Sequence, residues 1–208
     1  MDNKEVSSGQ PENEIQDKAK ARKDNVLMYL HDFVVWLVAI LLAFLLLFRV
    51  VVVSGGSMND TLIHGDYLLL LNNVLYLEPK QGDIIVAAKT DFRNGEPIIK
   101  RVIATEGQWV DIDFEKGIVY VNGTALDEPY TKTPTNAFEG VGFPLMVDEG
   151  CIFVMGDNRN GSKDSRHPDI GMIDTREILG KAVFLVFPGT GENGNEAPRD
   201  FDRIGAVN

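Results

Sequence analysis

Ser57 is the residue of this sequence best placed to act as a nucleophile. It lies in the segment Ser54-Gly-Gly-Ser-Met-Asn-Asp-Thr-Leu62, which directly follows a long apolar run. Gly55 and Gly56 allow positive φ angles and let another chain approach the backbone closely. A serine hydroxyl is a weak nucleophile unaided, so this interpretation requires a second side chain that takes its proton.

Histidine is the first candidate for that base. His31 lies in the apolar run, His64 lies in a turn between two predicted strands, and His167 lies in a polar loop. A triad of Ser57, His167 and Asp164 is compatible with the sequence. The asparagines, glycines and charges around His167 are more typical of a solvated loop.

Lysine is the second candidate. Lys100 lies in the otherwise apolar segment Pro97–Ala104, where strand alternation places Ile98, Lys100 and Val102 on one face. Burial disfavours the ammonium form, and a neutral lysine is a competent general base near neutral pH. On physical grounds alone, a lysine at a sheet edge that reaches solvent is the simpler interpretation.

A third segment, Met155–Asp169, is dense in turn-forming and charged residues. Its charged side chains can form salt bridges that hold a loop rigid, and its small hydroxyls can orient a neighbour: Asp157, Arg159, Asp164, Arg166, Ser162 and Ser165. A solvated loop or a calcium site are the alternatives, but the segment lacks the EF-hand spacing, and we expect no metal. Cys151 is the only cysteine, which excludes an internal disulfide and a thiolate metal site.

Short apolar and alternating runs after residue 53 predict strands: Asp66–Leu71, Gly82–Ala88, Pro97–Ala104, Trp109–Asp113, Gly117–Val121, Gly150–Met155 and Gly180–Phe187. Asn122-Gly123 is a strong hairpin signal. Residues 126–147 read as a loop, and only Asp174–Leu179 could form a helical turn. The fold class is therefore mainly β, with an antiparallel sheet domain.

The apolar run before Ser57 predicts one N-terminal transmembrane helix over residues 26–49. A buried core helix and a cleaved signal peptide are the alternatives, but no small-x-small cleavage site closely follows Arg49. Four basic residues precede the run, which predicts a cytoplasmic N-terminus and an extracytoplasmic domain: Lys18, Lys20, Arg22 and Lys23.

The chain of 208 residues carries a net charge of −11, which argues against a nucleic-acid partner. Four regions are expected. They are a disordered cytoplasmic tail (1–25), the membrane helix (26–49), an extracytoplasmic β-rich domain (50–190), and an acidic C-terminal tail (191–208).

Five motifs, in order after the predicted anchor, resemble those of the type I signal (leader) peptidases, membrane-anchored serine proteases with a Ser-Lys dyad. They are Ser54–Leu62, Gly65-Asp66-Tyr, Gly82-Asp83-Ile-Ile-Val, Ile99-Lys-Arg-Val-Ile-Ala104, and Gly156-Asp-Asn-Arg159 through Ser162-Lys-Asp-Ser-Arg166. The resemblance covers nearly all of residues 26–187. It implies that residues 50–190 form the catalytic domain, with a small second subdomain at about 111–150. It differs where the family usually has a proline and this chain has Asp60, an acid that could raise the pKa of Lys100. It also differs at Gly161 and Gly55.

The resemblance implies that Ser57 is the nucleophile, Lys100 the general base, and Ser162 a residue that hydrogen-bonds and orients the lysine. It also implies structural charges behind the site and substrate-binding segments on either side of it: Asp157, Asp164, Arg101 and Arg166 for the charges, and Val51, Val53, Pro97, Ile98 and Ile99 for the substrate.

The implied activity is removal of signal peptides from exported preproteins, without a cofactor. The implied setting is a single-pass protein of the cell membrane, in contact with the lipid bilayer and near the secretion translocon. The alternative is a non-catalytic, membrane-tethered β domain that binds extended peptides.

Overall fold

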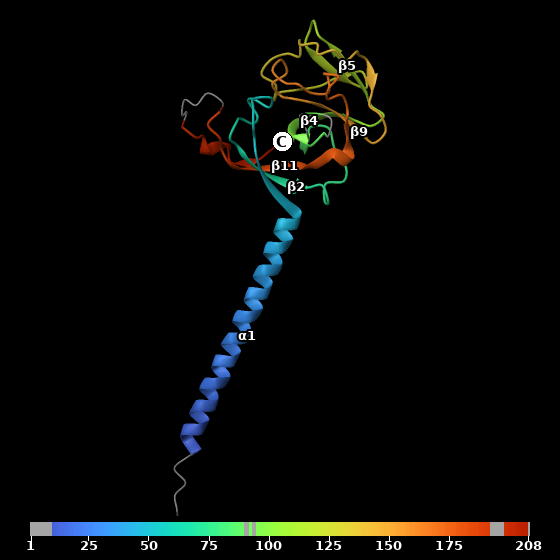
Figure 1. Cartoon of the computed structure of the whole chain (residues 1–208). Coiled ribbons are helices and arrows are strands. Elements are labelled where there is room, and N and C mark those ends of the chain that lie inside the picture. Colours follow the sequence, from blue (N-terminus) through green and yellow to red (C-terminus); the bar gives the residue numbers. More distant parts are fainter. Residues whose placement is uncertain (1–9, 90–91, 93–94, 192–197, 208) are drawn as a thin grey trace, which may run out of the picture. The chain divides into compact units, whose positions relative to one another are not determined.

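The computed structural model describes residues 10–89, 92, 95–191 and 198–207 (Figure 1). The chain divides into two compact units that meet between Leu46 and Leu47. The first unit holds almost all of one long helix, and the second holds all of the strands.

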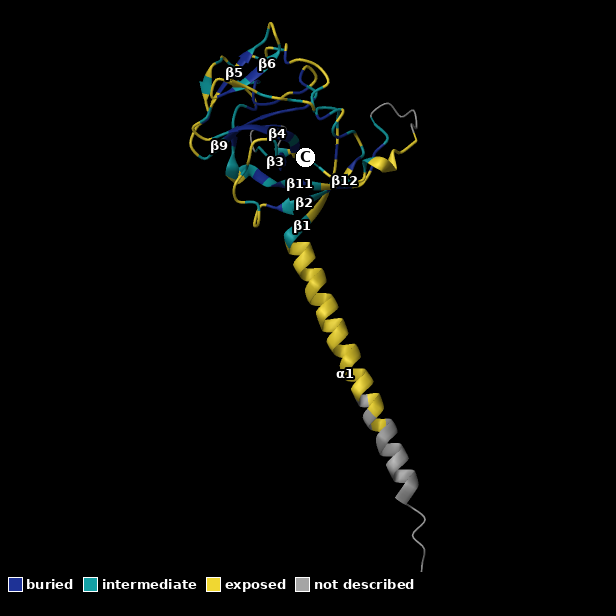
Figure 2. Cartoon of the chain, turned by 180° about the vertical axis from the view of Figure 1, so that it is seen from behind, coloured by how far each residue is buried: buried dark blue, intermediate teal, exposed yellow. Residues whose placement is uncertain are grey.

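Helix α1 runs from Gln10 to Leu47, and its segment Asn25–Leu47 is long and apolar enough to cross a membrane by length and composition. All side chains from Asn25 to Leu46 are exposed (Figure 2). The 23 residues of the segment Asn25–Leu47 span about 34 Å as a helix.

Two predicted boundaries of this region are wrong. The expected disorder of residues 1–25 does not hold for residues 10–25, which are helical, while residues 1–9 lie outside the described part. Pro11 suits a first helical turn, and the Glu, Gln, Lys and Ala residues that follow have high helix propensity. The predicted span of 26–49 is also too long, because Phe48 and Arg49 belong to a strand.

The second unit contains an eight-stranded sheet in the order β1-β2-β11-β3-β4-β9-β10, with β12 paired to β11. Every pairing is antiparallel, which confirms the predicted fold class. The bounds are β1 Phe48–Val52, β2 Tyr67–Asn72, β3 Ile84–Ala87, β4 Ile98–Thr105, β9 Cys151–Met155, β10 Ile173–Asp174, β11 Ile178–Phe187 and β12 Gly205–Ala206.

A smaller sheet has the order β7-β6-β5-β8. Its strands are β5 Trp109–Asp113, β6 Ile118–Val121, β7 Thr124–Ala125 and β8 Leu145–Met146. The predicted hairpin joins β6 to β7, and Asn122 and Gly123 both have positive φ angles, of 50° and 78°. That pattern is the type I′ turn that the Asn-Gly pair favours. The two-residue strand β8 lies in the stretch predicted as a loop.

The two sheets share a hydrophobic core. One buried cluster joins Ile103 of β4 and Phe153 of β9 to Val110 of β5 and Val119 of β6. The small sheet therefore packs on the larger one and lies in the stretch predicted as a second subdomain. Cys151, at the margin of this cluster, is half-buried, and burial raises the pKa of its thiol.

The C-terminal residues are part of the sheet domain, which corrects the prediction of a tail over 191–208. A short 3-10 helix, η3 (Phe201–Arg203), leads into β12, which pairs with β11. A second 3-10 helix, η2 (Thr175–Glu177), lies within the predicted helical turn. Glu192 and Glu196 lie outside the described residues.

Candidate active site

Ser57 lies in a compact turn between β1 and β2. Within the turn, the Asn59 N–H donates to Gly56 O at 3.2 Å and the Leu62 N–H donates to Met58 O at 2.9 Å. Met58 and Leu62 are buried to 1% exposure, so the turn is anchored by the apolar side chains that flank the serine. Gly55 has φ = 89°, a conformation that glycine adopts without strain.

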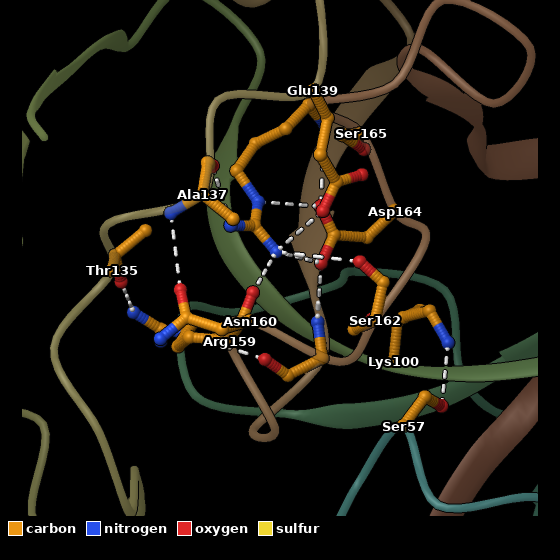
Figure 3. Close-up of polar contacts among 12 residues, drawn as sticks. Ser57, Lys100, Thr135, Ala137, Glu139, Arg159, Asn160, Ser162, Asp164 and Ser165 are labelled. Atoms are coloured by element: carbon orange, nitrogen blue, oxygen red, sulfur yellow. Dashed lines mark hydrogen bonds and ion pairs between the residues drawn. The ribbon is translucent and has the colours of Figure 1, made fainter.

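Lys100 lies on β4 and meets Ser57 across the site (Figure 3). Its Nζ is 2.8 Å from Ser57 Oγ and 2.9 Å from Ile99 O. The residue is only 3% exposed, although a lysine at a sheet edge usually reaches water. β4 holds it there because Lys100 pairs with Ile85 of the buried strand β3.

Asp157 and Arg101 form a buried ion pair behind the turn. Arg101 donates from Nε and Nη2 to the two carboxylate oxygens, each at 2.8 Å, a bidentate geometry. The Thr61 hydroxyl donates to the same carboxylate at 2.6 Å. The Tyr130 ring lies 3.9 Å from the Arg101 guanidinium, a cation–π contact. The pair therefore connects β4 to the turn that carries Ser57.

Asp164 and Arg166 form a second buried pair, and neither is measurably exposed. The Arg166 guanidinium donates to both Asp164 oxygens, at 2.9 and 2.8 Å, and to Arg159 O at 2.6 Å. Glu139 lies 3.1 Å from Arg166, and burial together with the charge of Asp164 raises the pKa of Glu139. Of the four charges expected to hold this loop rigid, Asp164 and Arg166 thus pair with each other, while Asp157 and Arg159 pair with residues elsewhere in the chain.

The predicted hydrogen bond from Ser162 to Lys100 is absent in the structure. Ser162 Oγ is buried and has no hydrogen-bond partner among the described residues. It lies against Gly156, where an added Cβ would be 2.1 Å from Ser162 Oγ and 2.4 Å from Ser57 O. Because Gly156 has no side chain, the serine turn and this loop can pack against each other at this point.

The histidines contact other groups. His167 Nδ1 accepts from the Asp169 N–H at 3.1 Å, while Asp164, its partner in the alternative triad, is held by Arg166. His64 Nδ1 accepts from the Gly55 N–H at 3.2 Å. The geometry of the described residues therefore favours Lys100 as the base.

Asp60 is exposed, and its carboxylate lies 3.3 Å from the Lys132 ammonium. An acid in that position is screened by water and by its partner, so its influence on Lys100 is small.

A groove of about 500 Å³ runs past Ser57 and Lys100. All five residues that the resemblance implies for substrate binding line it: Val51, Val53, Pro97, Ile98 and Ile99. β1 is the end strand of its sheet, and β4 pairs with β9 only from Arg101 onward. The groove therefore lies beside the end strand of the sheet and beside the part of β4 that precedes its pairing with β9. A groove in that position fits an extended peptide.

Sequence reasoning missed several residues of this arrangement. Thr61 was inside the serine segment but received no role. Tyr130 and Glu128 lie in the stretch predicted as a loop; Glu128 accepts from Arg159 at 2.7 and 2.5 Å. No periodic signal marks these residues, because their partners are distant in the sequence.

A groove lined by β1 and β4, beside a serine in contact with a buried lysine, is the geometry of a serine hydrolase site that binds extended chains. The family described as "Signal peptidase, peptidase S26" matches residues 26–187 of this chain. The chain belongs to this family.

Two sequence relatives agree with that assignment. A signal peptidase I of Bacillus licheniformis is 33% identical over 181 residues, covering 83% of this chain and 95% of the relative. A probable signal peptidase I-1 of Synechocystis sp. is 38% identical over 165 residues, covering 74% and 80%. A solved signal peptidase I from Enterococcus faecalis V583 is 29% identical, with a TM-score of 0.42, over 50% of this chain and 96% of that chain.

Proposed function

We propose that this protein is a membrane-bound serine endopeptidase that removes signal peptides from exported preproteins, with Ser57 as nucleophile and Lys100 as general base. The observation that carries the proposal is the 2.8 Å contact between Ser57 Oγ and Lys100 Nζ. Family membership supports the reaction, and the contact supports the assignment of roles.

Lys100 is suited to this role because it is almost completely buried. Removal from water disfavours an ammonium ion, so the amine gives up its proton more readily than a surface lysine does. In the neutral form, Nζ takes the Ser57 hydroxyl proton as Oγ attacks the scissile carbonyl carbon.

The following steps need no other group for proton transfer. As the tetrahedral intermediate collapses, the peptide C–N bond breaks and the Lys100 ammonium protonates the leaving amine. Water, deprotonated by the same lysine, then releases the signal peptide from Ser57. We assign one oxyanion donor, the backbone N–H of Ser57, because it adjoins the attacking oxygen.

The substrate is proposed to bind as an added strand between Val51–Val53 and Pro97–Ile99. Val53 and Ile98 are 3% and 8% exposed and so limit the depth of the groove. Small residues one and three positions before the cut fit these apolar walls, since alternate side chains of a strand face the same side.

Helix α1 is proposed to anchor the protein in the lipid bilayer with its N-terminus in the cytoplasm. Its apolar segment supports the anchor, and the four basic residues before it support the orientation. The sheet domain then acts on the extracytoplasmic side, near the secretion translocon that delivers preproteins.

The test compares Ser57→Ala and Lys100→Ala with Lys116→Ala, which removes an exposed lysine on the small sheet. Full-length variants in detergent receive a preprotein with an Ala-x-Ala site and, separately, a serine-directed acylating inhibitor. Both site variants should lose cleavage and labelling, and the control should retain both. Normal cleavage by either site variant contradicts the dyad. A folded wild type that neither cleaves nor becomes labelled supports a peptide-binding domain.

A further inference from the structure

The C-terminal segment 200–207, here called the C-terminal clamp, docks on the sheet. β12 pairs with β11 through Ala206 and Gly205, and the Val207 N–H donates to Val183 O at 3.2 Å. Val207 packs against the hydrophobic cluster that contains Met58, the residue next to Ser57. The clamp therefore lies against the part of the core that anchors the serine turn.

Arg203 of the clamp contacts Asp66, the residue immediately before β2. Its Nη1 donates to Asp66 Oδ1 at 3.0 Å, and its Nη2 donates to Asp66 Oδ2 at 2.7 Å. Nη2 also donates to the backbone oxygen of Thr61 at 3.2 Å. Arg203 is one-fifth exposed at its side chain, whereas Asp66 is completely buried.

Asp66 also forms hydrogen bonds with the backbone at both ends of the serine turn. Its carboxylate accepts from the Ile63 N–H at 2.8 Å and from the Gly189 N–H at 2.6 Å. Its backbone oxygen accepts from the Val53 N–H at 2.8 Å. The two ends of the serine turn, Val53 and Ile63, are thus joined through the residue that Arg203 holds.

Thr61, four residues after Ser57, connects this cluster to Asp157. Arg203 holds the Thr61 backbone oxygen, while Asp157 holds the Thr61 hydroxyl. Leu62, the residue after Thr61, donates its N–H to the backbone oxygen of Met58, the residue after Ser57. Thr61 is therefore fixed from two opposite parts of the chain, the C-terminal clamp and the loop after β9.

We propose that Arg203 is a positioning residue for the reaction, which holds the serine turn so that Ser57 Oγ stays within reach of Lys100 Nζ. This inference rests on the proposed function. Arg203 does not line the groove, so its loss should lower the rate of chemistry and leave substrate binding unchanged. A displacement of about 1 Å at a reacting group lowers a rate by about 100-fold.

The experiment uses the full-length enzyme in detergent. Arg203→Ala is compared with Arg199→Ala, which removes an arginine of the same C-terminal region that donates to Pro188 O and contacts no residue of the turn. The measurements are kcat, KM, the acylation rate of Ser57 by a serine-directed inhibitor, and the pH profile, each per folded protein. Arg203→Ala should lose about 10- to 100-fold in kcat and in acylation rate.

The pattern of these changes separates positioning from a general loss of stability. KM and the midpoint of the pH profile should stay at the wild-type values, because the groove and the base are intact, while the plateau of the profile falls. Arg199→Ala should retain wild-type kcat. Equal kcat for Arg203→Ala and wild type, or equal losses in the two arginine variants, would overturn the proposal.

Arg203→Lys covers the case in which the alanine variant fails to fold, since Asp66 keeps a cationic partner. Lysine is a point donor and lacks the fork that reaches both Asp66 oxygens and Thr61 O. Its kcat and acylation rate should fall to a value between wild type and Arg203→Ala, and wild-type rates would contradict positioning. Ser57→Ala, assayed alongside, separates the two ideas: activity there defeats the proposed function, whatever Arg203 does.

Discussion

Neutralising Asp157 should reveal how far the buried ion pair supports stability and how far it supports activity. Asp157 is completely buried, and Arg101 beside it is 2% exposed. In Asp157→Ala the guanidinium stays buried without its carboxylate. Breaking a buried pair in this way costs about 3–5 kcal/mol. At about 2–4 °C per kcal/mol for a domain of this size, the unfolding midpoint should fall by about 10 °C.

The double variant Arg101→Met, Asp157→Leu removes both charges and fills the space with apolar atoms. Replacing a whole buried pair in this way is often close to neutral, so stability should return to within about 1–2 kcal/mol of wild type. Activity should stay at least about tenfold low. The Thr61 hydroxyl has lost its acceptor, and the serine turn is held less firmly.

Urea and thermal unfolding of the full-length protein measure stability. Preprotein cleavage, assayed below the unfolding temperature of every variant, measures activity. Asp113→Ala, which removes the partly exposed partner of the exposed Lys116, is the control and should leave the midpoint nearly unchanged. A loss below about 1 kcal/mol in Asp157→Ala would show that Arg101 is not desolvated. Recovery of full activity in the double variant would show that Asp157 acts only through stability.

Three further outcomes follow from the site. Activity should rise with pH as Lys100 loses its proton. Lys100→Arg should be inactive at every pH tested, because a guanidinium does not deprotonate. Wild-type activity that stays constant down to acidic pH would contradict a lysine base. Gly156→Ala should lose at least about 100-fold in kcat, because the new Cβ would lie 2.4 Å from the nucleophile's carbonyl oxygen. Gly142→Ala, with open space around it, should keep wild-type activity, and an active Gly156→Ala would refute the close approach. A hydrogen bond from Arg176 lowers the pKa of Asp174 to about 2. The contact therefore adds stability above pH 4, and this contribution is lost as the pH falls toward 2. In an NMR titration, Arg176→Ala should move the pKa of Asp174 toward 3.8, and an unchanged pKa would exclude the contact.

The sheet was largely predictable from the sequence, because alternating runs and turn residues mark strands locally. β5 matches its predicted bounds, and the Asn122-Gly123 turn joins β6 to β7 as expected. β1 was not predicted as a strand, since an apolar run that continues from a membrane segment has no period that separates strand from helix. Its pairing with β2, a tertiary contact, decides the outcome.

The site was predictable only in part. Ser57 and Lys100 are 43 residues apart, and hydrophobic patterning says nothing of their contact; the resemblance of the motifs supplied it. Tyr130 and Arg203 were beyond reach for a different reason. Their roles depend on where a loop and the chain's end fold back, and both segments are polar and aperiodic.

The pairing of β2 with β11 and of β11 with β12 has a consequence for the order of events in the cell. β2 ends at Asn72, whereas its partner β11 begins only at Ile178. A ribosome must add more than half of the chain before this sheet can close, and such distant pairings form slowly. Ser57 should therefore become active only after the strands β11 and β12 have been synthesised and have paired.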